Sequence, residues 1–199
     1  MIALIDYGMG NLRSVQKALE TTGAEVCITQ KAESIQEAEK IVLPGVGATK
    51  PAMDKLFSLG LVESIKESIA ANKPFLGICL GFQLLFEQSY EGGCVEGLGI
   101  IKGSVKKFES LKVPHMGWNQ LEAVRKDCPL FQGIDDGTNV YFCHSYYAEP
   151  KENKVIATLT DYGINFASSI YDKNVFGVQF HPEKSQEVGL KILQNFAKT

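Results

Sequence analysis

The 199-residue sequence has few of the cysteines and histidines that form disulfides or bind a metal ion in small folds. It contains five cysteines, an odd number, with no Cys-x-x-Cys pair, and its three histidines do not stand at zinc-finger spacing from them. We therefore expect no disulfide framework, no metal site and no cofactor. Each cysteine has to be interpreted alone: Cys27, Cys79, Cys94, Cys128 and Cys143.

Long hydrophobic runs and runs of one charge are also missing. No apolar stretch is long enough to cross a bilayer, and the first residues, MIALIDYG, lack the regions of a signal peptide. The net charge is −3, and basic residues come at most in pairs such as Lys106-Lys107. Nothing here is typical of a nucleic-acid surface. We expect a soluble, cytoplasmic protein that binds neither nucleic acid nor a membrane.

Short apolar runs alternate with helical patterns in the first half of the chain. The runs cover residues 2–6, 26–29, 41–43 and 75–79, and the helical patterns cover residues 11–22, 35–38, 52–59 and 61–71. Strands joined by crossover helices pair in parallel, and near-continuous apolar strands are buried on both faces. This pattern predicts a parallel sheet covered by helices on both sides.

The second half is mostly strand-like. Strand patterns cover residues 99–108, 118–123, 139–143, 154–159, 166–171 and 175–180. A hairpin turn is expected at residues 172–174, and an amphipathic helix over residues 187–198 closes the chain. No linker, repeat or low-complexity segment divides it. We predict one α/β domain, residues 1–199, with a mixed central sheet.

Cys79 is the centre of a Gly-Ile-Cys-Leu-Gly motif at residues 77–81, between an apolar strand and a helical pattern over residues 80–86. This is the layout of a nucleophile elbow, a tight turn that needs very small neighbours on both sides of the nucleophile. Unpaired N–H groups at a helix start would also favour the thiolate. The alternative is an inert buried cysteine, which is the interpretation we favour for Cys27 and Cys143 in their apolar strands.

A cysteine nucleophile needs a base, and His181 is the best-placed histidine. It follows the strand pattern at residues 175–180 and precedes Pro182, which favours an extended conformation for the residue before it. In an extended chain His181 and Glu183 project to the same side, so Glu183 could orient the imidazole. The chain order Cys, His, Glu differs from that of α/β-hydrolases and argues against an ordinary esterase.

An acyl intermediate also needs an oxyanion hole. The N–H group of Leu80, the residue after the nucleophile, is one expected donor. The segment Pro-Gly-Val-Gly at residues 44–47 ends the preceding strand pattern, and the N–H group of Val46 is the expected second donor. A simple tight turn explains the same glycines equally well.

Three motifs together resemble the class I (triad) glutamine amidotransferases: PGVG at residues 44–47, GICLGFQ at 77–83 and HPE at 181–183. Three more, DYGMGNL at 6–12, KVPHMGWN at 112–119 and HSY at 144–146, resemble the amidotransferase subunits of imidazole glycerol phosphate synthases. The resemblance spans most of the chain. It implies a flavodoxin-like α/β fold, with helices on both faces of a mostly parallel, mixed sheet.

The resemblance also implies an activity and a partner. L-glutamine would be hydrolysed through a cysteine thioester to glutamate and ammonia. The ammonia would pass to a (β/α)8-barrel cyclase subunit, in a heterodimer that makes imidazole glycerol phosphate and aminoimidazole carboxamide ribotide in histidine biosynthesis.

Individual roles follow from the same resemblance, position by position. The catalytic triad would be Cys79, His181 and Glu183. Gly45 and Val46 match the oxyanion strand, whose peptide is thought to rotate when the loaded partner binds. Positions matching the glutamine site are Gln83, His144, Ser145 and Tyr146. Positions facing the barrel are Asn11, Met116, Trp118, Tyr141 and Lys184. A tryptophan is more often a core or rim aromatic, but the neighbours Gly117 and Asn119 and the polar setting favour an interface role for Trp118 without the resemblance. Lys184 by itself would be a solvated surface lysine.

Other functions are compatible with these residues. The same triad could hydrolyse another γ-glutamyl or peptide amide without passing ammonia on. A regulatory module that has lost turnover is disfavoured by the intact triad. The ammonia could instead serve a paralogous barrel that aminates a surface-sugar precursor. A dinucleotide site at Gly8-Met9-Gly10 is disfavoured, because Arg13 stands where the third glycine belongs.

Overall fold

The computed structural model describes residues 1–109 and 111–199. Within these residues the main sheet has the strand order β2-β1-β3-β4-β13-β12-β10-β7-β5-β6, and β11 pairs with β12. Its strands are β1 (Ile2–Ile5), β2 (Val26–Thr29), β3 (Lys40–Gly45), β4 (Phe75–Cys79), β5 (Phe86–Ser89), β6 (Val95–Glu96), β7 (Ile101–Lys107), β10 (Tyr146–Pro150), β11 (Ile156–Asp161), β12 (Asn165–Asp172) and β13 (Val175–Val178).

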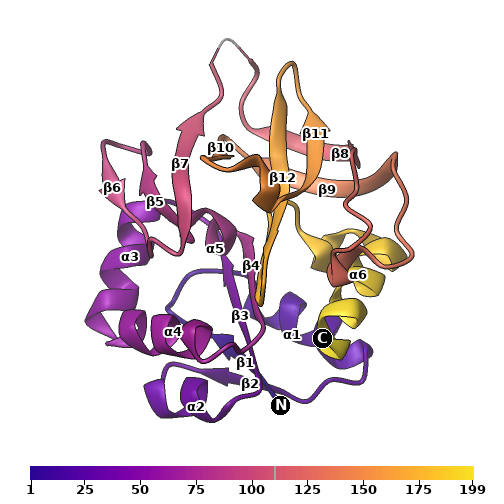
Figure 1. Ribbon diagram of the computed structural model, residues 1–199. Coiled ribbons are helices and arrows are strands. Elements are labelled where there is room, and N and C mark those ends of the chain that lie inside the picture. Colours follow the sequence, from indigo (N-terminus) through magenta and orange to yellow (C-terminus); the bar gives the residue numbers. More distant parts are fainter. Residues whose placement is uncertain (110) are drawn as a thin grey trace.

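The neighbours β2, β1, β3, β4 and β13 all pair in parallel, and the strands beyond β13 are mostly antiparallel. The mixed α/β sheet expected from the sequence is therefore confirmed. Helices lie on both faces of the parallel part (Figure 1). They are α1 (Leu12–Thr21), α2 (Ala32–Glu37), α3 (Thr49–Ser58), α4 (Leu61–Ala70), the single turn α5 (Leu80–Gln83) and α6 (Gln186–Lys198).

Alternate residues of each parallel strand belong to different cores. Val42 and Leu76 pack in the cluster that contains Leu19 of α1 and Phe196 of α6. Leu43, next in the chain, packs in the cluster that contains residues of α3 and α4. Successive side chains of a strand point to opposite faces, so a strand buried on both faces has to be apolar throughout. This is the reason for the near-continuous apolar runs.

Residues 80–86 differ from the expected helix, because α5 ends at Gln83 and the chain continues as β5. In a longer helix, the carbonyl groups of residues 84 and 85 would accept hydrogen bonds from the next turn, but here they accept from a different segment. Leu84 O accepts from the Leu98 N–H, and Leu85 O accepts from the N–H groups of Ile100 and Ile101. The segment before β7 thus caps the turn, and pairing between distant segments decides the end of the helix. Strands β5, β6 and β10 were not expected from the sequence.

A separate two-stranded sheet, β8 (His115–Leu121) with β9 (Thr138–His144), carries much of the residue set singled out above. The pairing sets Trp118 opposite Tyr141 and His115 opposite His144. In Figure 1 these strands lie beyond the end of β4, next to the start of α6. The expected hairpin between β12 and β13 is present, with Lys173 at a positive φ of 56°. No helix among the described residues is long and apolar enough to span a membrane.

Candidate active site

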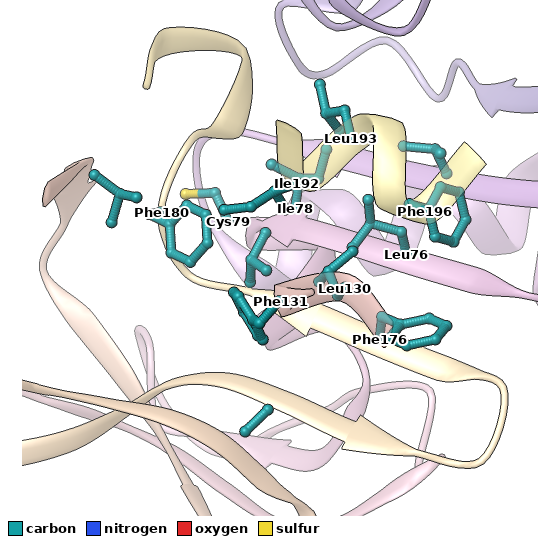
Figure 2. Packing of buried hydrophobic residues seen from close by; sticks show 14 of the residues in the cluster. Leu76, Ile78, Cys79, Leu130, Phe131, Phe176, Phe180, Ile192, Leu193 and Phe196 are labelled. Atoms are coloured by element: carbon teal, nitrogen blue, oxygen red, sulfur yellow. The ribbon is translucent and has the colours of Figure 1, made fainter. Parts of the chain in front are cut away.

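Cys79 ends β4 in a conformation that few non-glycine residues adopt, with φ 54° and ψ −106°. A Cβ atom on Gly77 would lie 2.6 Å from the carbonyl oxygen of Gly81, and one on Gly81 would lie 1.8 Å from the carbonyl oxygen of Leu43. Both neighbours must therefore be glycine, as a nucleophile elbow requires. In Figure 2 the Cys79 sulfur stands at the end of the row of packed side chains that Leu76 and Ile78 contribute from the same strand.

The sheet brings two other segments to this sulfur. Gly45 of β3 is paired with Cys79, and Val178 at the end of β13 is paired with Ile78. The residues after β13 therefore pass next to the elbow. Cys79 and His181 line one pocket of about 290 Å³ at the carboxyl edge of the parallel strands, which is where ligands bind in open α/β sheets.

His181 and Glu183 are joined by a hydrogen bond of 2.8 Å between the imidazole Nδ1 and Oε1 of the carboxylate. Their side chains are only 4% and 2% exposed. The local backbone differs from the extended chain expected there. Only His181 is extended, and Pro182–Lys184 form a 3₁₀ turn that carries Glu183 back under the ring. The Ser185 hydroxyl closes this turn by donating to the His181 carbonyl at 2.7 Å.

The environment of His181 favours the imidazolium ion. Burial by itself would lower the pKa of His181, but interactions with the Cys79 sulfur and the Glu183 carboxylate raise it to about 10. A protonated ring beside the sulfur stabilises the thiolate and can give its proton to a leaving group. The second oxygen of Glu183, Oε2, is buried and has no hydrogen-bond partner among the described residues.

The expected oxyanion residues flank the sulfur. Val46 and Leu80 both line the pocket, and the Val46 side chain is 44% exposed. Gly45 is buried against the Tyr7 hydroxyl, which would lie 2.2 Å from a Cβ atom at this position. That hydroxyl is buried without a partner among the described residues, and burial raises the pKa of Tyr7. Gly45 therefore has to be glycine because the phenol occupies the space behind it.

All four residues matched to the glutamine site line the same pocket: Gln83, His144, Ser145 and Tyr146. The Gln83 side-chain N–H group donates to the Tyr146 carbonyl at 2.9 Å, and His144 Nδ1 donates to the same carbonyl at 2.8 Å. A carbonyl oxygen has two lone pairs, so this one is fully used. The bend between β9 and β10 is thus fixed by two side chains.

A buried histidine pair supports this bend. Since His144 Nδ1 carries the hydrogen, its Nε2 accepts from His115 Nδ1 at 2.8 Å, and His115 Nε2 accepts from the Asn119 amide at 3.2 Å. Burial lowers the pKa of His115 to about 4 and that of His144 to about 3. Both rings are therefore neutral at pH 7, and their tautomers are fixed by the chain of hydrogen bonds.

Sequence reasoning gave no site role to three residues that the structure places here: Tyr7, His115 and Gln179. Gln179 had a signal, because it is a polar residue in an apolar strand pattern, two positions before His181 and hence on the same face. Tyr7 and His115 lie in the motifs at residues 6–12 and 112–119, but nothing in these motifs indicated their contacts, because their neighbours come from segments distant in the sequence. No group of three or more His, Cys, Asp or Glu in the described part of the chain is arranged to hold a metal ion.

Four of the five residues matched to a partner-facing role gather on one surface, which we call the β8–β9 surface: Met116, Trp118, Tyr141 and Lys184. Met116 is 60% exposed and Trp118 is 48% exposed. The Trp118 and Tyr141 rings meet edge to face at 6.1 Å, and Lys184 Nζ lies 5.8 Å from the centre of the Tyr141 ring. Asn11 is exposed at the start of α1, where its side chain accepts from the Ser14 N–H at 3.4 Å.

Comparisons with known proteins agree with this geometry. The family model described as "Glutamine amidotransferase class-I" matches residues 3–199. Proteins named imidazole glycerol phosphate synthase subunit HisH are 51% identical in Syntrophotalea carbinolica, covering 98% of both chains, and 52% identical in Caldanaerobacter subterraneus, covering 100% of this chain and 98% of the relative. A crystal structure described as a glutamine amidotransferase superposes with a TM-score of 0.78 at 16% identity over 100% of both chains, a likeness in fold alone.

Proposed function

Since this chain belongs to the class I glutamine amidotransferase family, we propose that Cys79, His181 and Glu183 are its catalytic triad. The protein is the glutaminase subunit of an imidazole glycerol phosphate synthase and acts in histidine biosynthesis. The observation that carries the proposed triad is the pocket that the elbow sulfur and the buried imidazole both line, with the Glu183 carboxylate hydrogen-bonded to that imidazole.

The reaction proceeds through a thioester. The Cys79 thiolate attacks the side-chain amide carbon of glutamine, and the N–H groups of Leu80 and Val46 stabilise the resulting oxyanion. His181 gives its proton to the departing ammonia, and then accepts a proton from the water that hydrolyses the thioester to glutamate. Glu183 holds the ring by its 2.8 Å hydrogen bond and balances the charge of the imidazolium.

Glutamine binds along the bend between β9 and β10. Gln83 stands one helical turn after the nucleophile, is 6% exposed and lines the pocket. Backbone groups of His144, Ser145 and Tyr146 hold the α-amino and α-carboxylate groups of the substrate. The support for this assignment is that all four residues line the pocket that contains Cys79.

A subunit of a synthase has a partner subunit, and we propose that this partner is a (β/α)8-barrel cyclase that binds the β8–β9 surface. Exposed methionine and tryptophan side chains are typical of interface cores, and Lys184 adds a charge at their edge. Ammonia made at Cys79 would then enter the barrel without meeting bulk water. A paralogous barrel that aminates a surface sugar is the alternative, and a coupled assay with each barrel distinguishes the two.

The test is Cys79→Ala in the complex with the barrel. Synthesis from glutamine should be abolished, whereas synthesis from added ammonium salts should remain, because only the nucleophile is removed. Cys27→Ala, at a half-buried cysteine on β2, is the matched control and should keep both activities. Loss of both activities in Cys79→Ala would assign this cysteine to the structure, and retained glutamine use would assign the chemistry to another residue.

A further inference from the structure

Gln179 follows β13 directly and is completely buried, although the proposed reaction gives it no role. Its side-chain nitrogen Nε2 lies 3.8 Å from the Cys79 sulfur. Its Oε1 accepts a hydrogen bond of 2.9 Å from Nε2 of Gln83. Its backbone N–H donates to the Ser168 carbonyl at 2.8 Å, which fixes the residue to β12. A buried amide that contacts the nucleophile calls for a physical reason.

The direction of these hydrogen bonds can be derived from one carbonyl group. The Tyr146 carbonyl can only accept, so Gln83 has to turn its NH₂ group toward it. The same NH₂ group also donates to Gln179, so the group that Gln179 turns toward Gln83 has to be its side-chain oxygen. The NH₂ group of Gln179 is then left facing Cys79, so the sulfur receives a donor and not an acceptor.

Two neighbours of the sulfur favour opposite protonation states. The carbonyl of Cys143, 4.0 Å away, can only accept, and it therefore favours the neutral thiol. The amide of Gln179 donates, and it therefore favours the thiolate. In a buried site such a hydrogen bond to a charged atom is stronger than in water, because the surroundings screen it less.

Other titratable groups also surround the sulfur. His181 favours the thiolate through its own positive charge, and Tyr7, whose hydroxyl lies against Gly45, is neutral because burial raises its pKa. The remaining ones line the pocket: Glu91, Cys143, His144, Tyr146 and Lys184. Of these, His144 is neutral because burial lowers its pKa. The fixed donor on the sulfur, besides the imidazolium, is therefore the Gln179 amide.

We propose that Gln179 is a positioning residue that holds Cys79 as a thiolate, with its orientation set by Gln83 and the Tyr146 carbonyl. The inference rests on the proposed role of Cys79 as nucleophile. It concerns the resting acidity of the thiol, however, and this acidity is measured without any turnover of glutamine.

The experiment measures the rate at which iodoacetamide alkylates Cys79 between pH 5 and pH 10, resolved from the other cysteines by peptide mass spectrometry. In Gln179→Met, which keeps the length and removes the donor, we expect the alkylation midpoint to rise by about one pH unit, with about tenfold slower alkylation at pH values below both midpoints. Gln179→Glu has the same shape but places a carboxylate beside the sulfur, so its midpoint should rise further.

Ser168→Ala is the matched control, because it removes a buried hydroxyl that bonds Thr158 at 2.8 Å on the neighbouring strand and leaves the sulfur untouched. It should lower stability and leave the alkylation midpoint unchanged. If Gln179→Met does not fold, Gln83→Met tests the same idea, since it frees the Gln179 amide to rotate and should shift the midpoint in the same direction by less. An unchanged midpoint in a folded Gln179 variant overturns the inference, while the Cys79→Ala assay would still stand as an independent test of the triad.

Discussion

Burial is the main reason why the two histidines at the pocket, His115 and His144, are neutral, and the charge of His181 lowers the pKa of His144 further. Their hydrogen bonds run in one direction, from the Asn119 amide through His115 and His144 to the Tyr146 carbonyl. Protonation of His144 would put two donors face to face at 2.8 Å, and protonation of His115 would do the same against the Asn119 amide at 3.2 Å. Either would add a charge to a buried site. The shape of the proposed glutamine pocket therefore depends on two side chains that have no role in the proposed reaction.

Stability should fall in acid because of this pair. The native pKa values, about 4 for His115 and about 3 for His144, lie below the usual value of 6.5. The unfolded chain then binds more protons than the native one below pH 6.5, so the contribution of both rings is complete above that pH and is lost as the pH falls toward 4.

Thermal unfolding between pH 7.5 and pH 4.5 measures this effect. The variant His115→Gln keeps a polar side chain that does not titrate, so its melting temperature should start lower at pH 7.5 and fall less steeply with acid than that of the native protein. Equal slopes for the two proteins would mean that other groups control the acid response.

At the scale of elements, the strand-to-helix turn at Cys79 depends on close contact between β3, β4 and α5. Gly81 packs directly on the Leu43 carbonyl, and Gly45 fits in front of the Tyr7 phenol. These contacts let the Cys79 backbone adopt a positive φ. This conformation costs about 1–2 kcal/mol for an ordinary residue, and it persists because the surrounding structure fixes it. The elbow is thus a property of three packed elements.

Gly81→Ala should destabilise the fold severely, by about 3 kcal/mol or more, because backbone has to move to make room for the new methyl group. Gly137→Ala is the control: Gly137 also has a positive φ, of 80°, but a Cβ atom there meets nothing within 4 Å. Gly137→Ala should lower the free energy of unfolding by only about 1 kcal/mol, because the backbone conformation is its single cost. Urea unfolding of both variants checks the difference, and similar losses would show that space at the elbow is not the limiting factor.

At the scale of the whole molecule, the strands β8 and β9 lie at the end of the fold where β4 ends (Figure 1), and Cys79 at the end of β4 lines the pocket. Lys184 lines the pocket and also lies over the Tyr141 ring, so one residue belongs to both. A partner that covers this surface would therefore cover the opening above Cys79. This arrangement agrees with a subunit that releases ammonia into a bound protein.

Trp118→Ala should weaken binding of the barrel subunit by about tenfold or more, because tryptophans at the centre of an interface contribute about 2 kcal/mol or more. Phe57→Ala provides the control, since Phe57 is 80% exposed on α3 and outside the β8–β9 surface. Titration calorimetry measures both affinities, and gel filtration shows whether the heterodimer forms. Equal affinities for the two variants would move the interface away from β8 and β9.

Local patterns in the sequence were enough for the parallel half of the sheet. The strands at residues 26–29 and 75–79 were placed at their observed bounds, because apolar runs between helical patterns report burial on two faces. The Gly-x-Cys-x-Gly motif was recognised equally well. Contact with Gly81 inside the turn requires Gly77, whereas the Leu43 carbonyl on the neighbouring strand requires Gly81, and that second contact is visible only in the structure. In contrast, α5 was expected to be longer, because its end is decided by hydrogen bonds to residues 98–101.

The sequence by itself therefore determined the elements of the parallel half, the residues proposed to carry the chemistry and the family that the chain belongs to, because these depend on local patterns and on residue type. Only the tertiary structure decided what surrounds the reacting sulfur. The Gln179 amide, the Tyr7 phenol and the neutral histidine pair reach the site from segments up to about a hundred positions away along the chain, as in the contact between Gln179 and Cys79. Their contacts arise from the register of neighbouring strands, which no local pattern encodes.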